Sequence, residues 1–211
     1  MTGKFITFEG IDGSGKTTQI NLLEAELSQQ GISTLILREP GGTKLSEKIR
    51  GILLNRKHIH LTYMAESLLF VAARAQLMAE KIKPALERNQ FVICDRFGDS
   101  TVAYQGYGRG LNIEYLEELN NYGTDGISPD LTIILDIDPE KAAERIHDTA
   151  PDRMESIGNN FFYKVQEGYY KIAQNNTHRC VIIDGNQTPE NVFETVYAKI
   201  NEKILKEFAC S

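Results

Sequence analysis

Gly10-Ile11-Asp12-Gly13-Ser14-Gly15-Lys16-Thr17 matches the pattern G-x-x-x-x-G-K-[ST] at every fixed position. Its glycines allow the backbone to wrap closely around an anion at positive φ, where a Cβ atom would clash. The N–H groups of such a loop, with the partial positive charge of the helix that follows, attract phosphate oxygens. We therefore predict a phosphate-binding loop (P-loop), in which Lys16 reaches the β- and γ-phosphates of a nucleoside triphosphate and Thr17 offers its hydroxyl to Mg²⁺.

The segments on either side of this loop supply the context that the motif requires. Before it, Lys4–Phe8 is apolar and β-branched and is predicted to be a buried strand. After it, Thr17–Gln30 has apolar residues at helical spacing, and Gly31 is suited to end that helix. A flexible glycine–serine turn is the alternative interpretation, but strand, loop and helix in this order favour the P-loop.

Composition places the chain among ordinary globular proteins and limits its partners. It has 211 residues, 41% hydrophobic and 25% charged, which suits one domain covering residues 1–211. A net charge of −6 without a basic run argues against nucleic acid as a partner, because binding to the phosphate backbone needs a positive surface. No apolar stretch approaches membrane-spanning length, so no membrane partner is expected.

Cysteine usage indicates a reducing compartment. Cys94, Cys180 and Cys210 are widely spaced and form neither a zinc pattern nor an evident disulfide framework. No charged-then-apolar signal region precedes the first predicted strand. We therefore expect a cytoplasmic protein.

Apolar runs alternate with amphipathic segments along the rest of the chain. Further strands are predicted at Ser33–Leu37, Phe91–Cys94, Leu131–Leu135 and Cys180–Ile183. Further helices are predicted at Leu45–Leu54, Met64–Arg88, Glu114–Tyr122, Pro139–His147, Asn160–Gln174 and Pro189–Glu207. Because the strand runs are apolar throughout, we predict a three-layer α/β fold of the P-loop NTPase type, with five parallel strands covered by helices on both faces. Ligands bind such sheets beyond the carboxyl ends of the strands.

Charged residues follow the predicted strands at that edge. Asp95 ends an apolar run and suits a Mg²⁺-holding carboxylate, and Arg96 beside it can donate two N–H groups to a phosphate monoester. With Arg38 and Arg50 it would form a second phosphate site, although each of these two alone is equally well explained by a surface ion pair. Asp95 to Gly98 also match the D-x-x-G pattern of GTPases, but the guanine-reading N-K-x-D pattern is absent from the sequence.

Two groups of residues have the spacing of a base pocket. Phe70 and Arg74 lie four apart, so on a helix they share one face, where a ring can stack on a base and an arginine can donate to its carbonyl. A phenylalanine on a helix is, taken alone, more often part of the core. Thr101, Tyr104 and Gln105 also fall at helical spacing and can form one wall of a pocket.

The motifs FEGIDGSGKTT, REPGGT, LLFVAARAQ, DRFGDSTVAYQG and PDLTIILD together resemble the thymidylate kinase family, with the bacterial form of the P-loop. The resemblance runs from Phe8 to about the C-terminal helix, in the same order and at similar spacings. It implies transfer of the γ-phosphoryl group of ATP to dTMP, giving dTDP and ADP, with Mg²⁺ as cofactor. It also implies a homodimer, for which the apolar segment Leu68–Met78 is a candidate face.

Around the phosphates, the resemblance assigns roles to individual residues. Gly10 to Thr17 would hold the phosphates of ATP, and Asp12 would accept a hydrogen bond from the 3′-hydroxyl of dTMP. Arg96, together with Arg50, would hold the acceptor phosphate. The turn at Glu39-Pro40 often carries a cis peptide in this family, which a proline at that position permits.

Around the nucleoside, the resemblance implies a pocket of five side chains. Phe70 would stack on thymine and Arg74 would contact its carbonyl, while Thr101 and Gln105 match positions near the base. Tyr104 would pack under the sugar and disfavour a 2′-hydroxyl, thereby selecting deoxyribose.

One segment departs from the family's pattern. Bacterial members usually carry several arginines in a lid, here expected at about 147–157, but the middle of this lid is about one residue shorter and has lost its basic residue. A cation over the γ-phosphate can be worth on the order of 10³ or more in rate. We expect Arg153, with Arg145, to supply it; the alternative is that another residue substitutes. The predicted catalytic residues are Lys16, Asp95, Arg96 and Arg153, and the predicted metal ligands are Thr17 and Asp95.

Some residues receive structural interpretations. Tyr163, Tyr169 and Tyr170 are interpreted as packing on a helix, and Asp136 and Asp138 as caps of the following helix.

Two alternative functions remain open from the sequence. One is a P-loop kinase with another nucleotide acceptor, and the other is an NTPase switch or partner-binding ATPase that hydrolyses ATP without an acceptor. The arginine cluster argues against the second alternative, which has no use for it.

Overall fold

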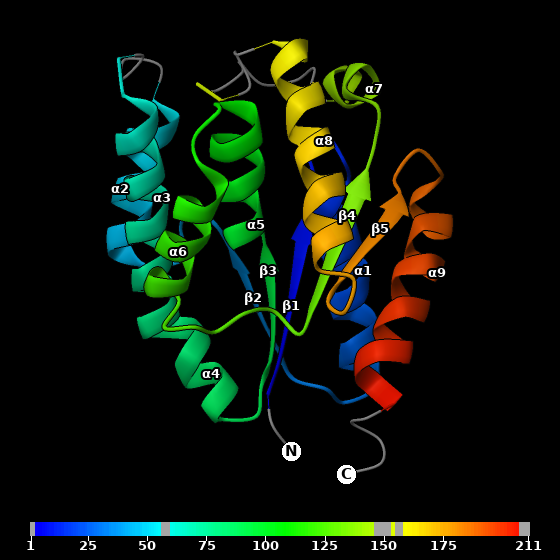
Figure 1. Cartoon of the computed structure of the whole chain (residues 1–211). Helices are drawn as coiled ribbons and strands as arrows, with labels where there is room; N and C mark the ends of the chain where they lie inside the picture. The colour runs from blue at the N-terminus through cyan, green and yellow to red at the C-terminus, as the bar shows by residue number, and fades with distance from the viewer. Residues whose placement is uncertain (1–2, 56–59, 146–152, 155–157, 207–211) are drawn as a thin grey trace.

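A computed structural model describes residues 3–55, 60–145, 153–154 and 158–206, and its centre is a five-stranded sheet in which every pairing is parallel. Side by side lie β2 (Thr34–Arg38), β3 (Phe91–Asp95), β1 (Lys4–Glu9), β4 (Leu131–Asp136) and β5 (Cys180–Asp184). All five predicted strands are confirmed. Because they are parallel, their carboxyl ends meet at one edge, the upper edge in Figure 1.

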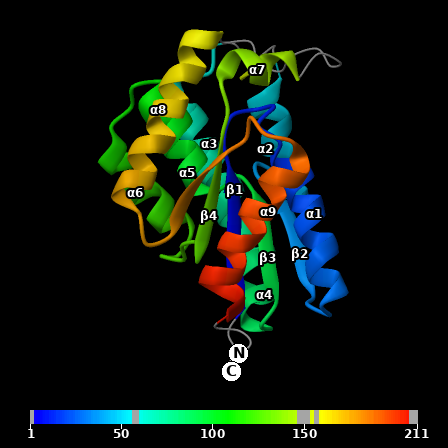
Figure 2. The same ribbon diagram turned by 90° about the vertical axis from the view of Figure 1, so that its right-hand side faces the viewer.

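Helices cover both faces of the sheet, as Figures 1 and 2 show from two sides. One face is covered by α1 (Lys16–Gln29) and α9 (Pro189–Ile200), which the π-helical turn η5 (Asn201–Leu205) extends. The other face is covered by α3 (Tyr63–Leu77), η2 (Met78–Ile82), α4 (Lys83–Glu87), α5 (Gly98–Thr101), η3 (Val102–Gly108) and α8 (Asn159–Asn175). The remaining helices are α2 (Lys44–Leu54), α6 (Ile113–Gly123) and α7 (Pro139–Glu144). The predicted three-layer fold is confirmed.

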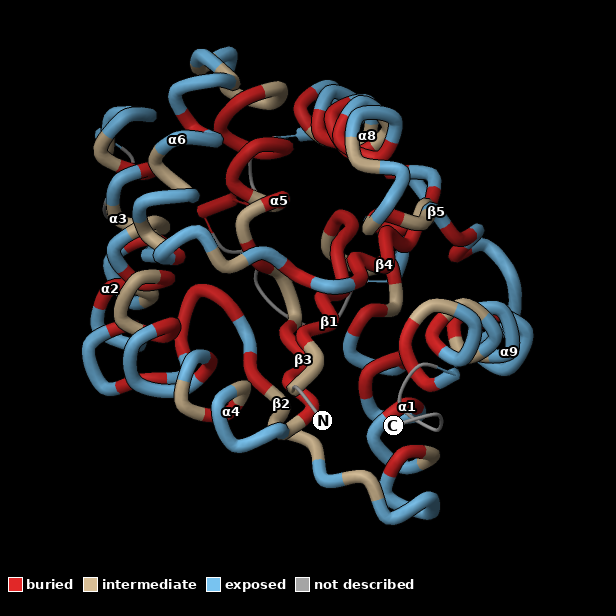
Figure 3. Tube along the Cα trace, turned by 60° about the horizontal axis from the view of Figure 1, so that its bottom comes forward, coloured by how far each residue is buried: buried red, intermediate tan, exposed pale blue. Residues whose placement is uncertain are grey.

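The two faces of the sheet differ in chemistry. Toward α1 and α9, side chains such as Ile6 and Phe8 form an apolar core. Toward α5 and α8, the alternate residues of β1 include Thr7 and Glu9, both fully buried, and the Thr7 and Thr132 hydroxyls lie 2.9 Å apart. Figure 3 shows this buried centre between the more exposed helices. The polar side of the sheet is therefore the side on which a hydrogen-bonded site can be built.

Short polar side chains set where several helices begin. Thr43, Thr62, Asn112 and Thr188 each accept a hydrogen bond from the backbone N–H three residues later, at the starts of α2, α3, α6 and α9. After α1, Gly31 has φ 74°, as expected of the glycine that ends a helix.

The segment predicted as one helix over Met64–Arg88 is α3, η2 and α4 in unbroken succession. Its π-helical turn lies just before Pro84, which has no N–H to donate to the carbonyl four residues earlier. The predicted ends at His147 and Glu207 lie outside the described residues, and α7 itself ends at Glu144. Within the described ranges, no helix is both long and apolar enough to cross a bilayer.

Candidate active site

The loop between β1 and α1 has the backbone that its sequence predicts. Gly10, Gly13 and Gly15 have φ of 133°, 79° and 93°, a region that other residues rarely adopt. A Cβ atom at Gly13 would also collide with the carbonyl oxygen of Ala142 on α7. Two of these glycines, Gly10 and Gly15, are fixed positions of the motif, and the loop leads directly into the N-terminus of α1, where anions bind.

Lys16 lies at the base of this loop and is buried. Its ammonium group donates to the carbonyl oxygens of Gly10, at 3.1 Å, and Ile11, at 2.9 Å. Burial lowers the pKa of Lys16 to about 8, and the nearby charge of Arg96 acts in the same direction. Phosphate oxygens would raise this pKa again, because an anion next to an ammonium group favours its protonated form.

Thr17 and Asp95 come together beside the loop. The hydroxyl of Thr17 donates to Asp95 Oδ2 at 3.3 Å, while Oδ1 of Asp95 is buried and receives no hydrogen bond from any described residue. A hydroxyl and a carboxylate oxygen are hard ligands of the kind that Mg²⁺ takes in addition to phosphates and water. The residues therefore fit the metal that the sequence predicts there.

Two cavities meet at this edge of the sheet. The loop cavity, of about 670 Å³, is lined by the P-loop and extends to Arg145 and Gln187. The side cavity is lined by residues predicted to hold a nucleoside, namely Phe70, Arg74, Thr101, Tyr104 and Gln105. Both cavities are lined by Asp12, Glu39, Arg50 and Arg96. A ligand in one can therefore reach a ligand in the other across these four residues.

Arg96 lies at the junction of the two cavities and is held by several acceptors. Its guanidinium pairs with Asp12 at 2.8 Å and donates to the hydroxyl of Tyr104 at 3.1 Å and of Ser100 at 3.1 Å. It also stacks over the Tyr104 ring, 5.0 Å from its centroid. Burial opposes the charge, but Asp12 and the neighbouring Tyr104, Tyr169 and Asp95 together outweigh it and raise the pKa of Arg96 well above its ordinary value. Arg96 is thus a permanent cation.

The backbone at Arg96 is fixed by β1. Arg96 has φ 69°, and its N–H donates to the carbonyl oxygen of Phe8 at 2.9 Å. The next N–H, of Phe97, donates to Glu9 Oε1 at 2.8 Å. The other oxygen of Glu9 accepts from Ser100 and, at 2.9 Å, from Tyr169. Burial raises the pKa of Glu9 to about 7, and the charge of Asp99 adds to the effect. Glu9 therefore holds both the turn and the hydroxyls that contact the guanidinium.

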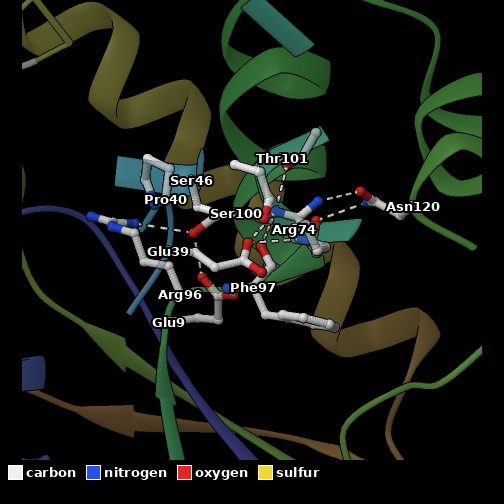
Figure 4. A network of polar contacts seen from close by, with 12 residues as sticks. Glu9, Glu39, Pro40, Ser46, Arg74, Arg96, Phe97, Ser100, Thr101 and Asn120 are labelled. Carbon is white, nitrogen blue, oxygen red and sulfur yellow. Dashed lines mark hydrogen bonds and ion pairs between the residues drawn. The ribbon is translucent and has the colours of Figure 1, made fainter. Parts of the chain in front are cut away.

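Arg74 lines the side cavity and is buried, with 1% of its surface exposed. Its guanidinium donates to Glu39 at 2.8 Å, to Asn120 at 2.5 Å, and to Thr101 and the carbonyl oxygen of Phe97 at 3.0 Å each (Figure 4). These contacts fix the plane of the group against the cavity.

Glu39 is the buried counter-charge of Arg74 and lines both cavities. Burial raises the pKa of Glu39 to about 7, although Arg74 opposes the shift. Its Oε1 is buried and accepts no hydrogen bond from the described residues. The peptide bond between Glu39 and Pro40 is cis, as the resemblance predicts.

The other predicted pocket residues lie on α3 and η3. Phe70 is half-buried on α3 and lines the side cavity, while Thr101 ends α5. The π-helical turn η3 carries Tyr104 and Gln105, both buried, on the wall of the same cavity. The structure therefore brings all five side chains of the predicted pocket together.

The structure separates Arg38 from the other arginines of the predicted second phosphate site, whereas Arg145 lies beside the P-loop. Arg38 pairs with Glu47 at 3.2 Å and lines only the loop cavity, so it does not join Arg50 and Arg96 in the side cavity. Arg145 lines the loop cavity and donates to the carbonyl oxygens of Gly13 and Gly185 at 3.4 and 3.3 Å.

Arg153 lies away from the P-loop. Its guanidinium donates to the carbonyl oxygen of Leu53 at 2.6 Å, and it pairs with the carboxylate of Glu66 at 2.6 Å. It lines neither cavity. In this arrangement the predicted γ-phosphate cation is therefore bound to α2 and α3 instead. The rest of the expected lid, 147–157, lies outside the described residues except for Met154.

Some residues of the site were missed or assigned differently from the sequence. Tyr169, interpreted as packing, donates to Glu9 and lies within 3.4 Å of Arg96. Asp138 caps α7 as predicted, but Asp136 accepts from Tyr170 instead of capping. For Glu9, the sequence offered one sign of a role in the site, which is an acidic residue at the end of an apolar strand. Its partners could not be predicted, because they are distant in sequence.

The fold and the paired cavities define a class of protein. A P-loop beside a magnesium-type carboxylate binds a nucleoside triphosphate, and a second cavity with fixed arginines suits a phosphorylated acceptor; this is the arrangement of a P-loop nucleotide kinase. Residues 8–196 match the family model described as thymidylate kinase. The chain belongs to the thymidylate kinase family.

Individual relatives agree over nearly the whole chain. A thymidylate kinase of Caldanaerobacter subterraneus subsp. tengcongensis is 46% identical, over 96% of this chain and 97% of its own length. One of Thermoanaerobacter sp. (strain X514) is 51% identical, over 89% of this chain and 92% of its own. The crystal structure of thymidylate kinase from Ehrlichia chaffeensis matches with a TM-score of 0.78 and 40% identity, covering 95% of this chain and 99% of that one.

Proposed function

We propose that this protein transfers the γ-phosphoryl group of ATP to dTMP, giving dTDP and ADP. The observation that carries the proposal is the junction of the loop cavity and the side cavity at Asp12, Glu39, Arg50 and Arg96. A triphosphate on the P-loop and a monophosphate beside Arg96 would place donor and acceptor against each other. Membership of the thymidylate kinase family supports the identity of both substrates.

Positioning and charge neutralisation account for the chemistry. The attacking atom is a phosphate oxygen of dTMP, which is already anionic at pH 7, so no side chain has to remove a proton from it. Lys16 would neutralise charge on the β- and γ-phosphates, and Arg96 would hold the acceptor phosphate in line. Asp12, which pairs with Arg96 at 2.8 Å, would accept from the 3′-hydroxyl of the sugar.

We also propose Mg²⁺ as the metal, held by Thr17 and by the unpaired oxygen of Asp95. When bound, it would supply charge neutralisation across the β- and γ-phosphate oxygens. The Thr17 hydroxyl and the Asp95 carboxylate would be the protein's contribution to its coordination, with the phosphates and water supplying the rest.

Recognition of the nucleoside falls to the side cavity. Phe70 would stack on thymine, Arg74 would donate to a carbonyl of the base, and Thr101 and Gln105 would line its edge. Tyr104 lies beneath Arg96, where its ring would exclude a 2′-hydroxyl. Arg145, which lines the loop cavity and donates to the carbonyl oxygen of Gly13, would act as a lid cation.

We propose a homodimer in the cytoplasm. Large apolar side chains are exposed on α2 and α3, namely Leu45, Ile52, Met64 and Leu68, and a second copy of the chain would cover them. The free, buried thiols of Cys94 and Cys180 suit a reducing compartment.

The test is ADP release from ATP and Mg²⁺ with a panel of monophosphates: dTMP, its ribonucleotide, dUMP, dCMP, dGMP and AMP. Strong stimulation by dTMP, with a weak response to the ribonucleotide, is the expected result. Equal ADP release with and without every acceptor would instead indicate an NTPase, and a stronger response to another nucleotide would assign a different acceptor.

A further inference from the structure

Glu66 is a buried carboxylate on α3 that lines neither cavity. Its two oxygens have different partners. Oε1 accepts from the side-chain amide of Gln105 at 2.9 Å, whereas Oε2 is paired with Arg153 at 2.6 Å and Arg109 at 3.5 Å. The arginines compensate the buried charge, and Gln105 connects the same carboxylate to the wall of the side cavity.

This contact fixes which end of the Gln105 amide faces the cavity. A glutamine amide has one end that only donates and one that only accepts, while a carboxylate only accepts. The NH₂ group must therefore point to Glu66, and the carbonyl Oε1 is left for the cavity side. Within the described part of the chain, no group donates to that Oε1.

We propose that Glu66 is a positioning residue for base specificity, which sets Gln105 to accept from N3–H of thymine and so rejects cytosine. The proposal rests on dTMP phosphorylation as the function of the site. Glu66 itself touches no substrate and acts through Gln105.

Thymine and cytosine differ in their hydrogen-bonding groups, so the orientation of the Gln105 amide discriminates between them. Thymine presents an N3–H donor beside its O4 acceptor, whereas cytosine presents an N3 acceptor beside an N4 amino donor. Arg74, which can only donate, suits O4. With Oε1 of Gln105 beside it, N3–H is satisfied, but the N3 lone pair of cytosine would face another lone pair. A site built for one hydrogen-bond pattern discriminates strongly against its reverse.

The two arginines make the effect of a substitution predictable. In Glu66→Gln, Arg153 and Arg109 still require an acceptor at the position of Oε2, so the new NH₂ group would take the position of Oε1. Facing an NH₂ group, Gln105 would have to turn its own carbonyl toward residue 66. Its NH₂ group would then point into the side cavity, where it opposes N3–H of thymine and suits N3 of cytosine.

The experiment measures kcat/KM for dTMP and for dCMP in the wild-type protein, Glu66→Gln and Arg153→Gln. Arg153→Gln is the matched control, because it breaks the ion pair at the same carboxylate and leaves the Gln105 contact. We expect Glu66→Gln to lower the dTMP-to-dCMP ratio about tenfold or more, chiefly through KM for dTMP. We expect Arg153→Gln to keep the ratio within about twofold of the wild type.

An unchanged ratio in Glu66→Gln, or an equal shift in both variants, would overturn the proposal. If thermal unfolding shows that Glu66→Gln does not fold, the same ratio is measured in Glu66→Asp. This variant keeps the negative charge that pairs with Arg153, but its carboxylate is one methylene further from Gln105. Its ratio must fall, and an unchanged ratio overturns the proposal. Failure of the proposed function would be distinguishable, because the wild-type protein would then show no preference for dTMP.

Discussion

The two cavities of the active site are built in different ways. The phosphate-binding part of the loop cavity is one contiguous segment, residues 10–17, whose backbone N–H groups and glycine conformations are local properties. The side cavity depends on side chains from α2, α3, α5 and η3, and Arg74 alone is held by partners 23 to 46 residues away. A site built from backbone N–H groups therefore keeps its geometry when distant residues are substituted. A site built from side chains loses its geometry when the hydrogen-bond network that holds those side chains is changed.

The largest effect on kcat is expected from a substitution of Lys16 in the loop cavity. Lys16→Met removes the cation that faces the β- and γ-phosphates, and kcat should fall on the order of 10²–10³-fold because transition-state charge is no longer neutralised. Steady-state ADP release measures it. Lys199→Met, at an exposed ion pair on α9, is the control and should behave as wild type. A loss below about threefold would contradict the assigned role of Lys16.

The second-largest effect is expected from a substitution of Arg96, which should lower phosphoryl transfer to dTMP more than ATP hydrolysis without acceptor. Arg96→Ala should lower kcat/KM for dTMP by about 100-fold, because it removes a charged hydrogen-bonding partner of the acceptor phosphate. Slow ATP hydrolysis without acceptor should persist, since Lys16 and the P-loop backbone are kept and only Asp12 loses its ion pair with Arg96. Arg88→Ala, at an exposed arginine after α4, provides the control. If acceptor-free hydrolysis fell as far as transfer did, Arg96 would act on the phosphates of ATP and not on the acceptor alone.

A pH profile tests the loop cavity alone. Burial lowers the pKa of Lys16 to about 8, so in the free protein the ammonium form is lost as pH rises through that value. Because kcat/KM reports the free enzyme, kcat/KM for ATP should fall about tenfold between pH 7 and 9, while kcat changes less since bound phosphate keeps the lysine charged. The measurement uses saturating dTMP. A flat kcat/KM profile up to pH 9 would count against a lysine with this pKa.

The smallest effect tests the side cavity. Phe70→Leu keeps an apolar side chain on α3 but removes the aromatic face, so KM for dTMP should rise about fivefold, with kcat and KM for ATP nearly unchanged. Phe193→Leu is a control of the same kind, because Phe193 packs on Tyr197 beside the apolar core on the other face of the sheet. An effect confined to KM for ATP would place Phe70 at the wrong substrate.

Much of the fold was predictable because its signals are local. Unbroken apolar runs such as Phe91–Cys94 predict buried parallel strands, and the edge where ligands bind follows from that topology. Helix interiors were less certain in detail. The π-helical turns at Met78–Ile82 and Val102–Gly108 carry no clear sequence mark, although Pro84 offers a reason for the first of them.

The pairing of charges was the part that sequence reasoning could not supply. Arg153 was predicted over the γ-phosphate from its place in the chain, yet the structure binds it to Glu66 and Leu53. Arg38 was predicted beside Arg96, but Glu47 lies within its reach. An arginine finds whichever acceptor the fold brings near, and that choice depends on contacts that are distant in sequence.

The sequence by itself determined the P-loop, the parallel sheet and the residue types of the pocket, because glycine conformation, hydrophobic pattern and motif spacing are properties of neighbouring residues. Only the tertiary structure decided how Glu9, Glu39 and Glu66 orient Arg96, Arg74 and Gln105. Each of these acids is buried, and a buried carboxylate must be matched by donors. Which donors match it is settled only when distant segments pack together.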